Sequence, residues 1–165
     1  MSHPEDEVDR IATAWQRERP DLDVSPLQVL SRVTRLARHL DLARRQAFAA
    51  HQLETWEFDV LAALRRAGPP YSLSPGQLGA ETLVTSGTMT NRIDRLEARD
   101  LVRREPDPND RRGVRVILTD TGRSAVDDAM SDFLTREHSL LASLPDADRA
   151  DLSNLLRVLV QQFGD

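Results

Sequence analysis

Cysteine is absent from the sequence, and its absence removes several kinds of chemistry together. A chain without thiols forms no disulfide bonds, senses no oxidant through a thiol and binds no metal through sulfur. Four histidines remain, at positions that share no metal-ligand spacing: His3, His39, His51 and His138. We therefore interpret the histidines as surface or packing residues, and we expect neither a metal nor another cofactor.

Long apolar runs are missing as well. No stretch of about 18 apolar residues occurs, so the sequence predicts no transmembrane helix. The first ten residues, MSHPEDEVDR, are acidic where a secretory signal needs a basic and then an apolar segment. Because 39% of the 165 residues are hydrophobic and 30% are charged, the composition is typical of one folded domain. We expect a cytoplasmic protein without membrane contact.

Glycine is scarce, with seven residues in the whole chain. Neither the G-x-G-x-x-G pattern of dinucleotide sites nor the G-x-x-x-x-G-K pattern of phosphate loops is present. Because thiol nucleophiles and metal clusters are also missing, the sequence predicts that the protein is not an enzyme. A small hydrolase built on scattered serine, histidine and aspartate is the one enzymatic alternative that the residues leave open.

Lysine is absent too, so all 22 basic residues are arginines. The net charge is −4 over residues 1–25 and −5 over 124–165, but +2 over each of 26–84 and 85–123. Arginine binds phosphate and guanine in bidentate geometry, although GC-rich coding produces the same bias. The basic middle of the chain is therefore a weak indication of nucleic-acid binding.

The two ends of the chain have the apolar spacing of amphipathic helices. The sequence predicts helices at about 5–18, 26–50 and 54–66, and later at 119–143 and 144–163. The helix at 54–66 is expected to place four apolar residues inward: Trp56, Val60, Leu61 and Leu64. In the middle, Ser74 and Pro75 are expected to start a short helix. A further helix is expected from the cap Thr85 to about Arg99, with Asp100 in the turn position that glycine favours.

Two stretches rich in β-branched residues follow, at about 101–105 and 113–118, and they enclose a turn of proline, aspartate and asparagine. This pattern is typical of a β-hairpin. The predicted fold is therefore mainly α with a small β-hairpin, in which a winged helix–turn–helix is inserted in a helical framework.

The helix that begins near Thr85 has a polar face made of Ser86, Thr88, Thr90, Asn91 and Arg95. A helix fits the major groove of DNA, where hydroxyls and amides near its N-terminus reach base edges and phosphates. A polar helix face on its own is more often a solvated surface.

The hairpin offers a second contact with DNA. Arg111 and Arg112 stand at its tip, where a wing can enter a minor groove narrowed by A/T pairs. Asp110 is expected to orient an arginine there. A basic turn alone is usually only solvated, but the order of two helices and then a wing favours DNA binding.

The stretch TSGTMTNRIDRLEARDLVRREPDPNDRRGVRVILTDTGR resembles the MarR family (multiple antibiotic resistance regulators), which are homodimeric winged-helix repressors of bacteria and archaea. The resemblance implies that the polar face of the helix after Thr85 is the recognition helix. It also implies that Arg112 is the minor-groove arginine, with Asp110 as its partner. The sequence departs from the family at Asp100, where glycine is common, although aspartate tolerates the left-handed conformation.

Dimerisation follows from the resemblance and from the apolar stripes of the end helices. We expect 1–165 to be a single MarR-like domain, with 1–50 and 120–165 as the dimerisation region and 54–118 as the DNA-binding lobe. A two-fold axis would set two recognition helices about 34 Å apart, so the operator should be a palindrome in double-stranded DNA. The alternative is that the stripes pack within one subunit.

The segment AWQRERPDLDVSPLQV resembles the urate-responsive subgroup of this family, which carries an added N-terminal helix with a tryptophan. That resemblance implies a ligand pocket built from Trp15, Asp59 and Arg92. A flat anionic heterocycle such as urate would stack on the indole while the guanidinium neutralises it. The alternative is that Trp15 covers the core and that Asp59 and Arg92 form a structural ion pair.

One further reading of the whole chain is left open, a helical protein–protein interaction module that uses the winged helix without DNA. Loss of affinity at higher salt, together with a preference for particular DNA sequences, would distinguish DNA binding from this alternative.

Overall fold

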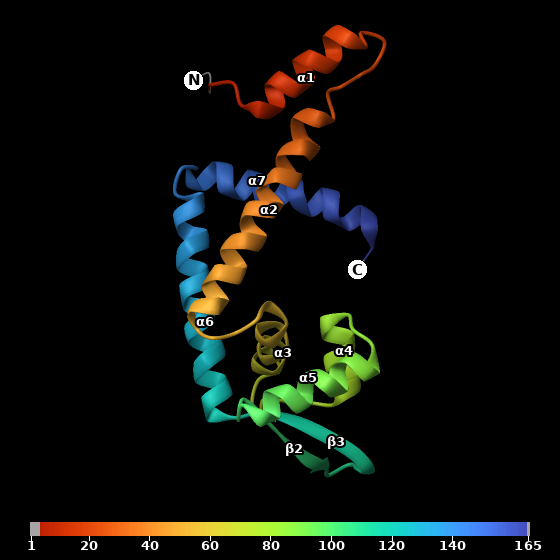
Figure 1. The fold of residues 1–165 in the computed structure, drawn as a ribbon, viewed down its shortest axis with the longest axis vertical. Helices are drawn as coiled ribbons and strands as arrows, with labels where there is room; N and C mark the ends of the chain where they lie inside the picture. The colour runs from red at the N-terminus through yellow and green to blue at the C-terminus, as the bar shows by residue number, and fades with distance from the viewer. Residues whose placement is uncertain (1–3, 165) are drawn as a thin grey trace. The chain divides into compact units, whose positions relative to one another are not determined.

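The computed structural model describes residues 4–164 (Figure 1). His3 lies outside the described residues. The elements follow in the order α1 (Glu7–Glu18), α2 (Leu27–Ala50), α3 (Thr55–Arg66), β1 (Ser72–Leu73), α4 (Pro75–Thr82), α5 (Ser86–Ala98), β2 (Val102–Asp107), β3 (Asp110–Leu118), α6 (Asp120–Leu141), α7 (Asp146–Val160) and the 3-10 helix η1 (Gln161–Phe163). The chain divides into two compact units, residues 1–45 and residues 46–165.

The predicted fold class is confirmed, because the structure is mainly helical with one small antiparallel sheet. The expected helices all occur, and most of their ends fall within two residues of the positions that the capping residues indicate. Within residues 4–164, none of the helices is long and apolar enough to cross a membrane.

In the first unit, arginines of α2 bind the start of α1. Asp6 caps α1 and accepts hydrogen bonds from the backbone N–H groups of Val8 at 2.7 Å and Asp9 at 3.1 Å. Arg32 donates to the same carboxylate at 2.8 Å and 3.0 Å, and Arg35 pairs with a neighbouring acid of α1. The hydrogen bond from Arg32 is the main reason that the pKa of Asp6 is lowered to about 2.

The core of the second unit is built around α3. Its inward residues are buried as the sequence predicts: Val60, Leu61 and Leu64. Trp56, which was also expected to point inward, is only half-buried. Phe48 at the end of α2 stacks on Phe58 with the ring centroids 3.8 Å apart. Arg65 reaches Asp127 of α6 at 2.8 Å, so α3 is attached to the long helix beside it.

A buried carboxylate joins the start of α3 to the end of α5. Glu57 is 2% exposed, and its two oxygens accept hydrogen bonds from Arg99 at 2.6 Å and 2.7 Å. Glu57 also accepts from the backbone N–H of Glu54 at 2.9 Å, while Arg99 donates to the carbonyl of Gln52 at 2.8 Å. Because a buried charge is costly unless it is paired, this network fixes α5 against α3.

Among the described residues, three helices end with a non-glycine residue in the left-handed conformation, followed by a Schellman hydrogen bond. These residues are Gln52 (φ 58°), Leu83 (φ 55°) and Asp100 (φ 55°). In each case the next residue donates its N–H to the carbonyl five positions back, at about 3.0 Å, which is the Schellman arrangement. The conformation predicted for Asp100 is thus confirmed. The sequence pattern carried no sign of a left-handed residue at Leu83.

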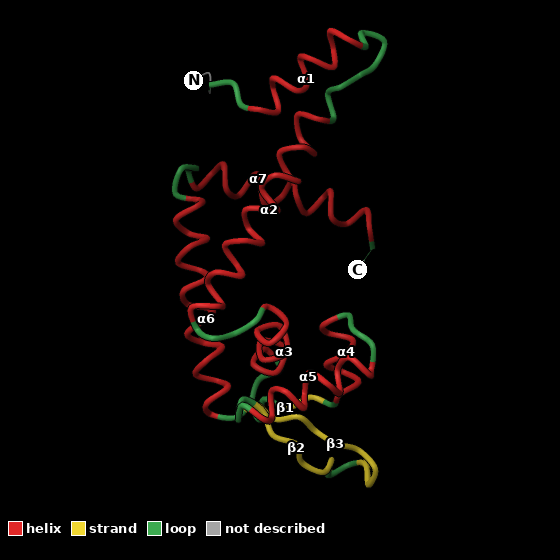
Figure 2. The backbone as a smooth tube through the Cα atoms, in the orientation of Figure 1, coloured by secondary structure: helices red, strands yellow, loops and turns green. Residues whose placement is uncertain are grey.

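The sheet has three strands in the order β1-β3-β2, and Figure 2 shows them below α5. The hairpin strands are longer than predicted, since β2 extends to Asp107 and β3 starts at Asp110, so the turn is only Pro108 and Asn109. Strand β1 was not predicted. It has two residues, which is too short for an alternating pattern, and it is recognised only by its pairing with β3.

Candidate nucleic-acid interface

Helix α5 presents a polar face because its apolar residues are spaced for burial on the opposite side. Met89, Ile93 and Leu96 are almost completely buried. The residues that the sequence assigned to the DNA-reading face are all exposed: Ser86, Thr88, Thr90, Asn91 and Arg95. The structure therefore leaves these five residues exposed on α5, outside its buried apolar side.

The N-terminus of α5 is capped by Thr85, as the sequence predicts. The Thr85 hydroxyl accepts from the backbone N–H of Thr88 at 3.4 Å and donates to the Thr88 hydroxyl at 3.0 Å. Thr90 donates its hydroxyl to the carbonyl of Ser86 at 3.0 Å. These bonds fix the hydroxyls at the positive end of a helix dipole, an arrangement that suits a phosphate oxygen.

Arg95 is the last residue of the predicted DNA-reading face. It contacts Trp56 on α3 and Glu54, the residue just before α3. Its guanidinium lies 3.4 Å from the Glu54 carboxylate and 4.7 Å from the centroid of the Trp56 ring. Arg92 lies over the same ring at 5.4 Å. The indole N–H of Trp56 in turn donates to Glu54. One tryptophan is therefore shared by an arginine assigned to DNA and an arginine assigned to a ligand.

The apolar spacing of α3 predicts an inward position for Trp56 and gives no sign of this contact with two arginines. The spacing of charged residues in the sequence does indicate a contact between α3 and α5. Arg92, Arg95 and Arg99 follow one another at helical spacing along α5 and its C-cap, and the acids Glu54, at the N-cap of α3, and Glu57, in its first turn, are spaced in the same way. Two helix faces of opposite charge are expected to pair where the helices meet.

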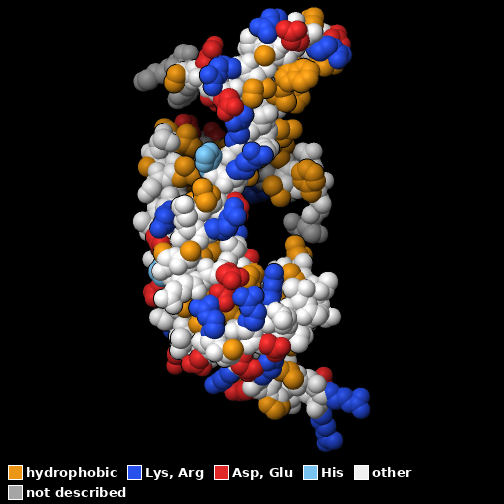
Figure 3. Space-filling model, viewed as in Figure 1, with side chains coloured by type: hydrophobic (Ala, Val, Ile, Leu, Met, Phe, Trp, Pro, Cys, Tyr) orange, Lys and Arg blue, Asp and Glu red, His pale blue; other side chains and the backbone are white. Residues whose placement is uncertain are grey.

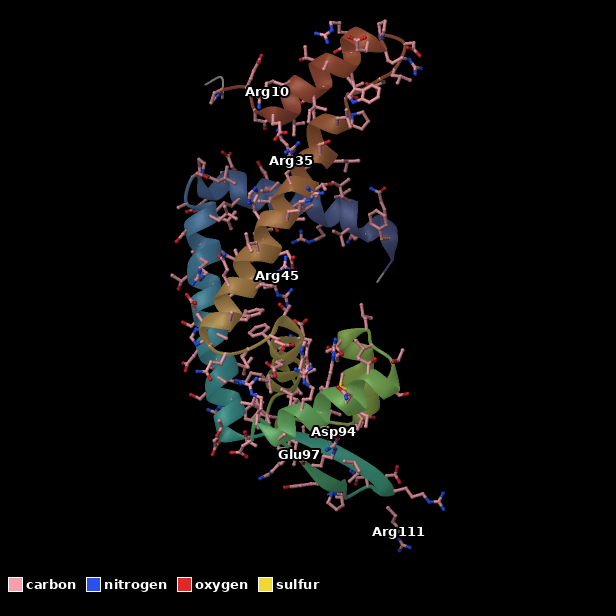
Figure 4. All side chains as sticks on the ribbon, in the orientation of Figure 1. Arg10, Arg35, Arg45, Asp94, Glu97 and Arg111 are labelled. Carbon is pink, nitrogen blue, oxygen red and sulfur yellow. The ribbon has the colours of Figure 1, made fainter. Side chains whose placement is uncertain are left out.

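The tip of the wing is held by aspartates that bind backbone rather than side chains. Asp107 accepts from the backbone N–H of Asn109 at 2.9 Å, and Asp110 accepts from the backbone N–H of Arg112 at 2.9 Å. Asp110 is thus a partner of Arg112, but through the main chain. The side chain of Arg111 extends from the end of the wing (Figure 4). Among the described residues, neither arginine of the tip has an ion-pair partner.

The other arginines of the hairpin have structural partners. Arg103 pairs with Glu105 at 3.0 Å on the same strand. Arg115 donates to the hydroxyl of Ser72 at 2.8 Å and so attaches β3 to β1. Arg104 bridges to two carboxylates of α5, those of Asp94 and Glu97. Of the hairpin arginines that the structure describes, the two at the basic end of the wing, seen in blue in Figure 3, remain available for an external anion.

The residues assigned to a ligand occupy different parts of the chain. Trp15 is on α1 in the first unit, where its side chain is 50% exposed and lines a shallow apolar hollow with Ile11 and Ala14. Asp59 lies half-buried on α3, and Arg92 lies half-buried on α5 over Trp56. The three-residue pocket therefore stays a prediction.

Comparison with known proteins gives a consistent result. Residues 51–113 match the family model described as the MarR family. The chain is 37% identical over 150 residues to the HTH-type transcriptional regulator PecS of Dickeya dadantii, covering 91% of this chain and 90% of that protein. It is 33% identical over 144 residues to the repressor NicR of Pseudomonas putida, covering 84% and 89% of the two chains.

A solved structure is also similar. It is BpsR of Bordetella bronchiseptica, whose DNA binding is regulated by 6-hydroxynicotinic acid. The two chains superpose with a TM-score of 0.65 at 29% identity, and the match covers 81% of this chain and 93% of BpsR.

Proposed function

Because this chain belongs to the MarR family of transcriptional regulators, we propose that it is a homodimeric repressor that a small anionic aromatic ligand releases from a palindromic operator. The observation that carries the proposal is the 37% identity to PecS over nine-tenths of the chain. The exposed polar face of α5 and the unpaired arginines of the wing give that likeness a physical basis.

The proposed contacts with double-stranded DNA divide between two grooves. Helix α5 enters the major groove, where its hydroxyl, amide and guanidinium groups reach base edges and phosphates. The contacting residues are Thr85, Ser86, Thr88, Thr90, Asn91 and Arg95. The wing enters the neighbouring minor groove with Arg111 and Arg112, while Asp110 holds the backbone of the tip.

The proposed dimer uses the helices at both ends of the chain, 1–50 and 120–165, and leaves 54–118 to bind DNA. Two sets of exposed apolar side chains support this proposal. In the second unit, α7 has no buried residue among those described, and Leu155 and Val158 are 65% and 61% exposed. In the first unit, Leu30 of α2 is 55% exposed. Apolar surfaces of this kind are normally covered by a partner.

The proposed ligand is a flat anionic heterocycle, with urate as the first candidate. Two observations support this class. The relative BpsR is regulated by 6-hydroxynicotinic acid, which is itself a small aromatic acid. In this chain, Arg92 lies on the proposed recognition helix, with its guanidinium over the indole ring of Trp56. A ligand that binds Trp15, Asp59 and Arg92 would therefore act directly on the helix that reads DNA.

The test is a gel shift of the purified protein on the DNA upstream of its own gene, over a salt series and with or without urate. We expect a sequence-specific shift that weakens at higher salt and is released by urate. A specific shift that ignores urate would keep the repressor and reject urate as the ligand. Failure to bind any specific duplex, including duplexes selected from a random pool, would favour a protein-interaction module instead.

A further inference from the structure

The turn between α4 and α5 contains a leucine in a conformation that leucine rarely adopts. Leu83 has φ 55°, in the left-handed region. The Schellman arrangement requires this conformation, because the N–H of Leu83 donates to the carbonyl of Ala80 at 3.4 Å and that of Val84 donates to Gly79 at 3.0 Å. Glycine is the usual residue at such a position, since its lack of a Cβ removes the steric conflict.

The side chain of Leu83 does not contribute to the core. It is 91% exposed, the highest value among the large apolar residues described. The comparable position at the end of α5 is occupied by Asp100, a residue type that tolerates the left-handed region. Leu83 is therefore unfavourable both for the backbone and for hydration. Conformations of this kind concentrate at functional sites, where an external partner accounts for the residue.

The position of Leu83 points to the partner. Its side chain lines a groove of about 430 Å³ together with Thr85, Ser86 and Thr90. These three residues belong to the polar face that we propose reads DNA. Leu83 is thus the large apolar side chain at the N-terminal end of the recognition helix, directly beside hydroxyls suited to base edges and phosphates.

The floor of the major groove carries one apolar group, the C5-methyl of thymine. Aliphatic side chains distinguish thymine from the other bases by contact with this methyl. We propose that Leu83 contacts a thymine methyl in each half of the operator and so contributes to sequence specificity. This inference rests on the proposed DNA-binding function and adds a specificity-determining residue to it.

The experiment replaces single thymines by deoxyuridine, which removes only the methyl group, in a duplex selected from a random pool. Binding is measured by fluorescence anisotropy at one fixed salt concentration for the natural protein, L83A and L83G. For the natural protein, we expect one thymine per half-site at which deoxyuridine weakens binding about fourfold, the value of one buried methyl. L83A should bind the thymine duplex about five- to tenfold more weakly and should no longer distinguish thymine from deoxyuridine there.

L83G is the matched control for the backbone. It relieves the left-handed conformation that L83A retains, so its melting temperature should rise above that of L83A. If the side chain is the cause, L83G loses the preference for thymine as completely as L83A does. Thymines outside the contacted position should respond equally in all three proteins.

The proposal is overturned if the natural protein shows no thymine that is sensitive to deoxyuridine, or if the sensitivity persists in L83A. It is also overturned if L83A binds as tightly as the natural protein, because Leu83 would then serve a surface other than DNA. In these cases specific DNA binding still stands. Absence of any selected duplex would instead reject the proposed function together with the inference.

Discussion

Arg104 of β2 and Glu97 of α5 are joined through both the main chain and the side chain of the arginine. The backbone N–H of Arg104 donates to one oxygen of Glu97 at 3.0 Å, and its guanidinium donates to the other at 2.5 Å. The guanidinium also binds Asp94, one turn earlier on α5. Figure 4 shows Asp94 and Glu97 on the helix beside the wing. The wing is therefore attached directly to α5, the helix proposed to read DNA.

The first prediction concerns this bridge. R104A should lower the free energy of unfolding by about 1–2 kcal/mol, because two charge-assisted hydrogen bonds are lost. It should also weaken DNA binding more than the loss of one positive charge explains, since wing and helix no longer hold a fixed angle. Urea unfolding and anisotropy measure the two effects. R103A is the matched control, because Arg103 has only the exposed partner Glu105. Equal loss of DNA binding in both variants would contradict the prediction.

The second prediction concerns the tip of the wing. R112A should weaken operator binding about tenfold and leave the dimer intact, because the side chain is proposed to contact DNA and has no ion-pair partner among the described residues. The salt dependence of binding should fall by about one counterion per site. R103A again serves as control for the charge. If R112A bound a palindromic site as well as the natural protein, the assignment of the wing to DNA would be wrong.

The third prediction concerns Glu54, which pairs with Arg95 and would compete with DNA for it under the proposed contacts. E54Q should tighten binding about threefold, because an exposed ion pair of about 0.5 kcal/mol no longer holds the guanidinium. The variant E81Q removes a similar exposed acid that pairs with Arg66 at 3.5 Å, so it corrects for the general change in charge. Anisotropy on one duplex compares the two. An equal effect of both substitutions would show that Arg95 is not released by loss of Glu54.

The fourth prediction concerns pH. The folded pKa of Asp6 is lowered from its ordinary 3.8 to about 2, chiefly by the hydrogen bond from Arg32. Its contribution to stability is therefore fully present above about pH 4 and is lost as the pH falls toward 2. We expect α1 to loosen over this range. Because the chain has two tryptophans, the fluorescence of Trp15 in a W56F background reports it.

R32A should loosen α1 already at neutral pH and flatten the response to acid, since Asp6 then has no arginine partner. R17A is the matched control, because Arg17 on α1 pairs only with its neighbour Glu18 in an exposed position. A response to acid that R32A leaves unchanged would contradict the assignment to Asp6.

Local sequence signals predicted the helices well, and the reason is physical. Ser74, Thr85 and Thr119 each accept a backbone N–H at the start of their helix, so residue type alone marks the boundary. Asp100 was predicted for a similar reason, because its residue type tolerates the turn that the helix end needs. Leu83 escaped prediction because its residue type argues against the conformation that it adopts.

Long-range partners could not be predicted in the same way. The bond from Arg115 to Ser72 and that from Arg99 to Glu57 join residues more than 40 positions apart. A pattern of charges shows that such residues exist but not which of them meet. For this reason the sequence assigned Arg111 and Arg112 to DNA but gave no partners to Arg103, Arg104 and Arg115, which the structure pairs within the fold.

The last prediction concerns Gly122, on the first turn of α6. A Cβ at this position would lie 2.0 Å from the carbonyl oxygen of Leu101, a distance that no packing tolerates. The approach is close because Thr119 caps α6 and also donates its hydroxyl to the carbonyl of Asp100 at 2.6 Å, which pulls the helix start onto the end of α5. G122A should therefore lower the free energy of unfolding by about 3 kcal/mol or more, as overpacking against backbone does.

Gly87 offers the matched control, because a Cβ there meets nothing within 4 Å and the residue is also helical. G87A should raise stability by about 0.5–1 kcal/mol, the difference in helix propensity between glycine and alanine. Urea unfolding should therefore show changes of opposite sign in the free energy of unfolding for the same glycine-to-alanine substitution at the two positions. Equal effects would mean that α6 moves freely against Leu101, and the attachment of the wing region to α6 through Thr119 would have to be abandoned.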